Sequence, residues 1–248
     1  MSNWASRTAW VIGASSGIGA AVAKELTSRG CRVAISARNA DALHEVSGDD
    51  MLVVPVDIAQ RTSVESAASE VLRTFGEFDL VIVVAGYWQQ MSGQAFDFDV
   101  FAAHNDVNTL GLARCAAAVL PHMQANGRGT FVGVSSVAGY RGMPGSSGYG
   151  PSKAAQLNLL ESLRCDLRGT GVAVQTVAPG FVRTPMTDVN TFKMPFLIEA
   201  DEAARHIVDG IDRGKAEIVF PRNMMLAMKL ARLVPQQLWP RLFKPVKP

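Results

Sequence analysis

Short apolar runs recur along the chain and alternate with stretches in which apolar positions follow helical spacing. The runs are nearly continuous, which is typical of strands that helices cover on both faces. Residues 17–30 and 60–76 instead repeat apolar positions every three or four residues. The pattern predicts an α/β fold: one doubly wound, Rossmann-like parallel sheet of seven strands with helices on both faces. The predicted strands are residues 8–13, 32–37, 51–56, 80–85, 130–135, 172–177 and 216–220.

Three glycines stand between the first predicted strand and the helix that follows it. Gly13, Gly17 and Gly19 give the spacing G-x-x-x-G-x-G, which differs from the common dinucleotide fingerprint G-x-G-x-x-G. A glycine-rich turn that opens a helix leaves backbone N–H groups available to bind phosphate. The same residues also suit a tight turn that binds no ligand, so the spacing alone leaves both interpretations open.

A second group of reactive side chains lies far downstream. Tyr149 and Lys153 are four residues apart at the start of a predicted helix, so both emerge on one face, and Ser136 precedes them. A free phenol has a pKa near ~10. An ammonium ~6 Å away favours the phenolate by roughly 2–3 kcal/mol at an effective dielectric of ~20. This lowers the pKa by about two units, toward the range of a general acid–base. The alternative is that both residues lie on the solvated side of an amphipathic helix.

In these features the chain resembles the short-chain dehydrogenases/reductases. The resemblance covers about residues 7–220 and includes the glycine spacing and Ser136, thirteen residues before Tyr149. The other matches are an asparagine after the fourth strand, an acid that closes the third strand, and a Pro-Gly turn followed by a threonine: Asn108, Asp57, Pro179, Gly180 and Thr184. The resemblance therefore implies that the glycine turn is a phosphate cradle.

The resemblance also implies roles for the reactive residues. Tyr149 gives or takes the proton on the substrate oxygen, and Ser136 donates a hydrogen bond to that oxygen. Lys153 lowers the pKa of Tyr149 and holds the nicotinamide ribose. Asn108 holds a water in a proton relay from Lys153, unless it only satisfies buried backbone groups. The implied cofactor-binding residues are Gly13, Ser15, Ser16, Gly17, Ile18, Gly19, Arg38, Asp57, Ile58, Ala85, Gly86, Tyr149, Lys153, Pro179, Gly180 and Thr184.

One motif departs from the family pattern. Family members usually end the fourth strand with Asn-Asn-Ala-Gly, whereas this chain has Val83-Val84-Ala85-Gly86. Valine side chains cannot make the hydrogen bonds by which those asparagines tie neighbouring strands and border the cofactor. The catalytic residues are unaffected.

The end of the second predicted strand indicates which cofactor is used. Members that prefer NAD place an acid about twenty residues past the glycines to bind the ribose 2′-hydroxyl. Here the sequence is Ser36-Ala37-Arg38, and a guanidinium can pair with a 2′-phosphate. The sequence therefore predicts NADP(H) over NAD(H), unless Arg38 is only a solvated surface residue.

Residues 185–199 occupy the position of the family's variable substrate-covering segment. They contain more apolar side chains than a bare surface loop carries, so they either face an apolar substrate or pack on the body of the protein. The predicted substrate residues, besides Ser136 and Tyr149, are Tyr87, Trp88, Met143, Phe192 and Phe196.

We therefore expect an NADP(H)-dependent oxidoreductase of a ketone/secondary alcohol pair with a lipid-like or aromatic substrate. The alternatives are a 3-oxoacyl thioester reductase and a non-catalytic NADP(H)-binding sensor or scaffold.

Composition narrows the class of protein. The 248 residues carry a net charge of only +2, which argues against nucleic acid as a partner. Three cysteines, an odd number set in apolar segments, predict reduced, buried thiols and a cytoplasmic protein: Cys31, Cys115 and Cys165. The four histidines lack ligand spacing, so we expect no metal. We also expect no signal peptide and no membrane span.

The last 28 residues break the strand–helix pattern, so we divide the chain into a catalytic dinucleotide-binding domain, 1–220, and a basic, apolar C-terminal extension, 221–248. The extension carries six basic residues and no acid, which leaves 18 basic against 22 acidic residues elsewhere. A helix there is expected to stop at Pro235. Its apolar side must be buried, either in the protein itself, over the substrate site or in a homo-oligomer (dimer or tetramer), or at an anionic membrane surface. We favour the protein itself.

Overall fold

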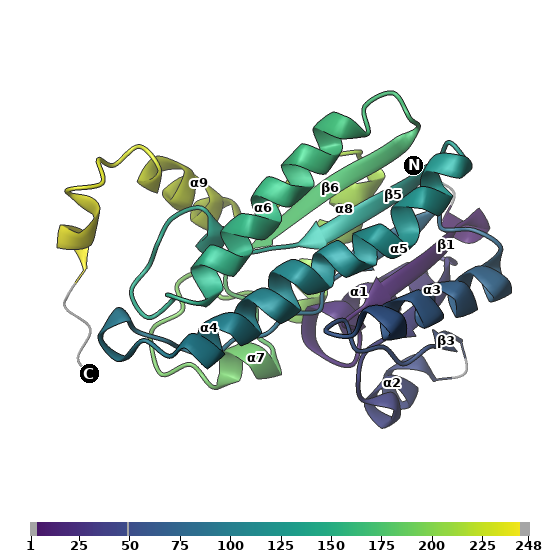
Figure 1. Ribbon diagram of the computed structural model, residues 1–248, viewed down its shortest axis with the longest axis horizontal. Coiled ribbons are helices and arrows are strands. Elements are labelled where there is room, and N and C mark those ends of the chain that lie inside the picture. Colours follow the sequence, from purple (N-terminus) through teal and green to yellow (C-terminus); the bar gives the residue numbers. More distant parts are fainter. Residues whose placement is uncertain (1–3, 49, 244–248) are drawn as a thin grey trace.

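The computed structural model describes residues 4–48 and 50–243 and contains the predicted sheet (Figure 1). Seven parallel strands lie in the order β3-β2-β1-β4-β5-β6-β7. The predicted fold class is thereby confirmed. The strands are β1 (Thr8–Ile12), β2 (Arg32–Ser36), β3 (Leu52–Val53), β4 (Leu80–Val83), β5 (Gly129–Val134), β6 (Val172–Pro179) and β7 (Glu217–Phe220).

Helices cover both faces of the sheet, as Figure 1 shows. Alternate residues of β1 enter two separate cores: Val11 packs in the core under α1 and α8, and Trp10 packs in the core under α3, α5 and α6. This period of two explains why the strands are apolar on both sides. The helices are α1 (Gly17–Ser28), α2 (Ala40–Ser47), α3 (Arg61–Phe75), α4 (Phe98–His104), α5 (Gly111–Ala125), α6 (Tyr149–Asp166), α7 (Pro185–Asp188), α8 (Ala200–Asp212) and α9 (Arg222–Ala231).

The third strand is shorter than predicted, because it ends at Val53 rather than at residue 56. Pro55 has no N–H to donate to a ladder. The N–H groups of Val54 and Val56 nevertheless bind carbonyls at the end of β2, at 3.0 Å each. The segment therefore remains alongside β2 and carries Asp57 to the carboxyl end of the sheet.

Two details of the chain's path affect the site. The strand order reverses between β1 and β4, and a ligand crevice is expected at the carboxyl ends of strands at such a point. A π-helical turn, Asn105–Leu110, joins α4 to α5 and holds Asn108 in the interior. π-Helical turns are rare and often lie at functional sites.

The prediction that all three cysteines are buried is wrong for Cys165. Cys31 and Cys115 pack in the two cores, whereas Cys165 is exposed in the last turn of α6. The buried residues of α6 face the sheet and the π-helical turn, and Cys165 is not among them. No helix in the described part of the chain is long and apolar enough to cross a membrane.

The C-terminal extension packs one side on the body and leaves the other in solvent. Met224 and Met228 of α9 contact the segment that contains Tyr140 and Met143. The Trp239 indole N–H donates to the Gly142 carbonyl at 2.6 Å. As predicted, the helix ends before Pro235. The outer side exposes five leucines, Leu226, Leu230, Leu233, Leu238 and Leu242.

Candidate active site

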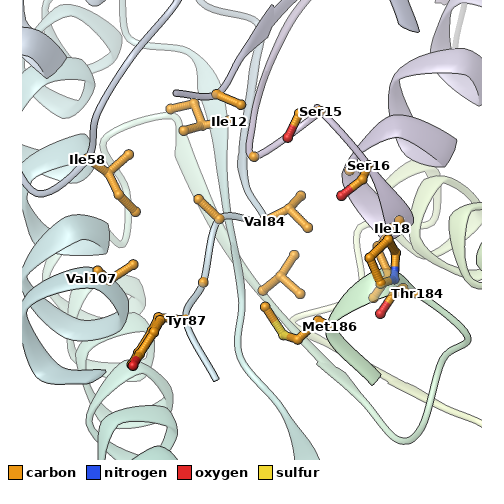
Figure 2. Close-up of a pocket in the computed structure, with 18 of the residues that line it drawn as sticks. Ile12, Ser15, Ser16, Ile18, Ile58, Val84, Tyr87, Val107, Thr184 and Met186 are labelled. Carbon is orange, nitrogen blue, oxygen red and sulfur yellow. The ribbon is translucent and has the colours of Figure 1, made fainter. Parts of the chain in front are cut away.

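A cleft of about 660 Å³ opens at the carboxyl ends of β1, β2 and β4–β6, where the strand order reverses. Every residue predicted to contact the cofactor lines this cleft, as do Ser136, Tyr149 and Lys153. In Figure 2, Ser15, Ser16 and Thr184 lie along one side, and Ile58, Val107 and Tyr87 lie along the other. Residues from positions 12 to 187 thus meet in one space.

Two glycine positions of the turn have no room for a side chain. Gly13 has a φ of +96°, and a Cβ there would lie 2.3 Å from the backbone nitrogen of Ala85. A Cβ at Gly19 would lie 2.0 Å from the carbonyl oxygen of Gly13. Helix α1 begins at Gly17, so its first N–H groups and the positive end of its dipole border the cleft. This bare backbone turn at a helix N-terminus fits a dinucleotide pyrophosphate.

The far end of the cleft offers a cation where β2 ends. Arg38 lines the cleft between Ala37 and Asn39, and Asn39 caps α2 by accepting the N–H of Ala42 at 3.1 Å. Across the cleft, the Asp57 carboxylate accepts the N–H of Ala59 at 3.0 Å, which fixes the loop after β3. The position of Arg38 suits a ribose-phosphate, and the position of Asp57 suits an adenine.

The reactive hydroxyls come from the segments after β5 and at the start of α6. Ser136 caps a short turn by accepting the N–H of Ala138 at 3.1 Å. Ser135 donates to the backbone carbonyl of Lys153 at 2.8 Å and so ties α6 to the end of β5. This bond brings Tyr149, in the first turn of α6, against the segment that carries Ser136.

The surroundings of Tyr149 differ from the expectation that Lys153 lowers its pKa. Burial raises the pKa of Tyr149 to about 12, and a hydrogen bond with Ser136 acts in the opposite direction. The Lys153 Nζ lies 5.5 Å from the centroid of the Tyr149 ring. Its amine donates elsewhere, to the Val134 carbonyl at 3.1 Å and to Gln156 Oε1 at 2.9 Å. Burial in turn lowers the pKa of Lys153 to about 7.

Asn108 lies behind the cleft and does not line it. Its side chain spans the backbone of Tyr87: Oδ1 accepts the N–H at 2.7 Å, and Nδ2 donates to the carbonyl at 3.0 Å. Nδ2 also donates to Ser152 Oγ at 2.9 Å. Asn108 therefore joins the strand end at Tyr87 to the helix of Tyr149 and Lys153. The side chain satisfies buried backbone groups, which is the alternative raised for it above.

His104 is a further residue beside the site that the sequence does not single out, and it is fully buried four residues before Asn108. Its Nδ1 lies 2.7 Å from the Val100 carbonyl, which can only accept, so Nδ1 carries the proton. Its Nε2 then accepts the N–H of Gln89 at 3.1 Å. Burial lowers the pKa of His104, which favours this neutral form. The sequence signal that could have indicated His104 is its i,i+4 spacing to Asn108, which places both side chains on one helix face.

The predicted substrate residues fall into two groups. Tyr87 lines the cleft, and Trp88 stacks edge-on against Tyr149 with ring centroids 5.1 Å apart. Trp88 also donates to Asn190 Oδ1 at 3.0 Å and so binds the 185–199 segment. Trp88, Phe192, Phe196 and Met143 do not line the cleft. Phe192 packs against Phe181, Phe196 is exposed, and Met143 contacts α9.

Comparison with known proteins identifies the family. A family model described as short chain dehydrogenase matches residues 7–194. The chain belongs to this family. Short-chain dehydrogenases bind a nicotinamide cofactor and act on small molecules, and the chain is an oxidoreductase of this kind.

The chain is similar to an uncharacterized oxidoreductase of Myxococcus xanthus, 38% identical over 96% of this chain and 97% of its own. A 2-(R)-hydroxypropyl-CoM dehydrogenase of Xanthobacter autotrophicus is 36% identical over 73% of this chain and 77% of its own.

Solved short-chain dehydrogenases share the fold. One from Burkholderia cenocepacia, in complex with NADP, superposes with a TM-score of 0.85 at 27% identity, over 96% of this chain and 98% of its own. One from Burkholderia phymatum, in complex with NAD, has a TM-score of 0.86 at 22% identity, over 100% of this chain and 99% of its own.

The valines that replace the common asparagines of short-chain dehydrogenases are accommodated by packing. Val83 is buried in the sheet and pairs with Ile12 and Gly133. Val84 lines the cleft, and the N–H groups of Val84 and Ala85 bind the Ile12 carbonyl at 2.8 and 2.9 Å. Backbone hydrogen bonds thus hold this strand end to β1.

Proposed function

We propose that the protein is an NADP(H)-dependent oxidoreductase that acts on the ketone/secondary alcohol pair of an apolar, lipid-like or aromatic substrate. The convergence of Ser136, Tyr149 and Lys153 in the same cleft as the glycine turn supports this most strongly. When bound there, the nicotinamide supplies or accepts the hydride.

The protein's own side chains handle the substrate oxygen. The Tyr149 hydroxyl gives the proton to that oxygen in reduction and takes it back in oxidation. The Ser136 hydroxyl, beside Tyr149, donates to the same oxygen as its charge develops. The Lys153 ammonium stabilises the phenolate that remains and binds the ribose hydroxyls. Asn108 holds the backbone at Tyr87 beside this group.

The proposal of NADP(H) rests on Arg38 at the end of β2, where the cleft is lined by Ala37, Arg38 and Asn39. A guanidinium pairs with a 2′-phosphate through two parallel hydrogen bonds. An acid at this point would repel that phosphate and favour NAD(H) instead.

An apolar substrate is supported by the groups around Tyr149. Trp88 covers the ring of Tyr149, and Tyr87 and Met186 line the adjoining part of the cleft. Exposed Phe192 and Phe196 lie in the 185–199 segment, which Trp88 holds through Asn190. We propose that these two side chains turn toward a bound substrate.

A panel of carbonyls and alcohols followed at the absorbance of NADPH tests this function. The panel contains aromatic ketones, long-chain ketones and 3-oxoacyl thioesters. We expect turnover with apolar ketones, at a kcat/KM with NADPH well above that with NADH. Turnover of thioesters alone would favour the 3-oxoacyl reductase. NADPH binding without turnover of any compound would indicate a sensor or scaffold.

We further propose that the protein is a cytoplasmic homo-oligomer and that the five exposed leucines of the C-terminal extension lie in a subunit contact. Replacing Leu226, Leu230 and Leu233 by serine leaves the buried side of α9 unchanged. We expect a smaller mass by light scattering and unchanged NADPH binding. An unchanged mass together with lost sedimentation on anionic vesicles would favour the membrane surface instead.

A further inference from the structure

One buried polar side chain in the site has no role in the mechanism above. Gln156 is 1% exposed and lies three residues after Lys153 on α6, so the two side chains share a face. Both ends of its amide are engaged: Oε1 accepts from Lys153 Nζ at 2.9 Å, and Nε2 donates to the Asn108 backbone carbonyl at 2.6 Å. Gln156 thus connects Lys153 to the π-helical turn.

The chemistry of the two partners fixes the direction of this amide. An ammonium can only donate, so it must meet the amide oxygen, and a backbone carbonyl can only accept, so it must meet the amide nitrogen. An aliphatic side chain of this length would satisfy neither partner. A carboxylate would accept from Lys153 but would repel the Asn108 carbonyl.

The position of Lys153 makes this bond important. Its side chain is 3% exposed, and burial penalises its charge. Two acceptors, the Val134 carbonyl and Gln156 Oε1, take up two of the three N–H groups of its ammonium. The third remains for the ring of Tyr149 and for the cleft. Among the described residues, Tyr149 on α6 and His104 on α4 are titratable groups that face Lys153.

We propose that Gln156 is a positioning residue, which holds the Lys153 ammonium between α6 and the π-helical turn and so keeps it charged and directed at Tyr149. The inference rests on the proposed function for its effect on turnover, whereas the hold on Lys153 can be measured without turnover. The group at position 156 determines whether the pKa of Lys153 falls or rises. Removing an acceptor favours the neutral amine, and replacing it with a carboxylate favours the ammonium.

Two substitutions should therefore move the titration of Lys153 in opposite directions. Gln156→Leu removes the acceptor, and we expect Lys153 to titrate about one pH unit lower. Gln156→Glu places a carboxylate at the same distance, and we expect titration about one pH unit higher. Both substitutions should lower kcat/KM, because the Asn108 carbonyl loses its donor. In the pH profile of kcat/KM, the alkaline limb should move to lower pH in Gln156→Leu and to higher pH in Gln156→Glu.

The measurement is an NMR titration of protein labelled with ¹³C at lysine Cε, with Lys153→Arg to assign the signal. Gln175→Leu is the matched control, because Gln175 is a buried glutamine on β6 whose Oε1 has no partner among the described residues. Opposite shifts with an unmoved control support the proposal. Identical shifts in both variants, or none, overturn it.

The titration and the turnover assay separate the two claims. If the wild type turns over no substrate but Lys153 titrates as expected, the proposed function fails and the inference stands. If the wild type is active and the titration does not move, the inference fails and the function stands. Should Gln156→Leu not fold, Gln156→Glu decides by the upward shift alone.

Discussion

The two sides of the cleft are built differently. The cofactor side is a tight backbone turn between β1 and α1, and the substrate side depends on contacts between side chains from distant segments. In the glycine turn, positions 13 and 19 have room only for main chain, because a Cβ at Gly13 or Gly19 would lie within 2.3 Å of backbone atoms. The substrate side instead depends on Trp88, which packs against Tyr149 and donates to Asn190, 102 residues further along the chain. A local backbone constraint can be predicted from the sequence, here from the glycine spacing. Contacts between distant side chains depend on the tertiary structure and cannot be predicted in this way.

Tyr149 and Lys153 lie between these two sides, and their arrangement depends on both local spacing and distant contacts. Their i,i+4 spacing is local, but the direction of Lys153 depends on Val134 in β5 and on the Gln156 bridge to Asn108. Burial moves the two pKa values away from the expectation drawn from the spacing. The sequence therefore predicts candidate reactive groups but not their protonation in the folded protein.

The largest effect is expected from Tyr149→Phe, which keeps the ring and removes the proton-transfer group. We expect kcat to fall by about 10²–10⁴-fold, the usual contribution of general acid–base catalysis, with NADPH affinity within a few fold. Tyr140→Phe is the control, because its hydroxyl binds Glu217 rather than Ser136. Near-normal kcat in Tyr149→Phe would contradict the role of Tyr149.

A smaller effect is expected at the cofactor side from Arg38→Asp. The change removes a phosphate partner and adds a charge that repels phosphate, so the NADPH/NADH ratio of kcat/KM should fall by roughly 10- to 150-fold, as for 1.5–3 kcal/mol. Arg61→Asp, at an exposed arginine on α3, is the control, and its NADPH/NADH ratio of kcat/KM should equal that of the wild type. A wild type that already prefers NADH would contradict the choice of NADP(H).

The smallest effect is expected at the substrate side from Trp88→Phe. The ring that covers Tyr149 stays, but the hydrogen bond to Asn190 is lost, at a cost of about 0.5–1.5 kcal/mol. We expect KM for an apolar ketone to rise roughly 2- to 10-fold while NADPH affinity stays the same. Trp4→Phe, at a tryptophan packed beside α1, is the control. An equal rise in KM in both variants would contradict a role of Trp88 in holding the segment.

The apolar runs predict the sheet, because they reflect local constraints, and the residues predicted to bind the cofactor all line one cleft. The sequence predicted less of the substrate side. Phe192, Phe196 and Met143 were grouped as substrate residues, yet none lines the cleft, since their positions depend on how α9 and the 185–199 segment pack. His104 and Gln156 were missed for a related reason. Histidine and glutamine are common on helices, and only the fold shows which of them is buried against the site.

The central claim is that this cleft transfers a hydride to a carbonyl while Tyr149 supplies the proton. Mass spectrometry of products formed from NADPH deuterated at C4 tests it most directly, with the ketone panel, wild type and Tyr149→Phe compared at saturating cofactor. We predict a secondary alcohol with one deuterium on carbon from the wild type and essentially none from Tyr149→Phe, although both bind NADPH. Undeuterated products throughout, or equal deuterium transfer by both proteins, would contradict the account.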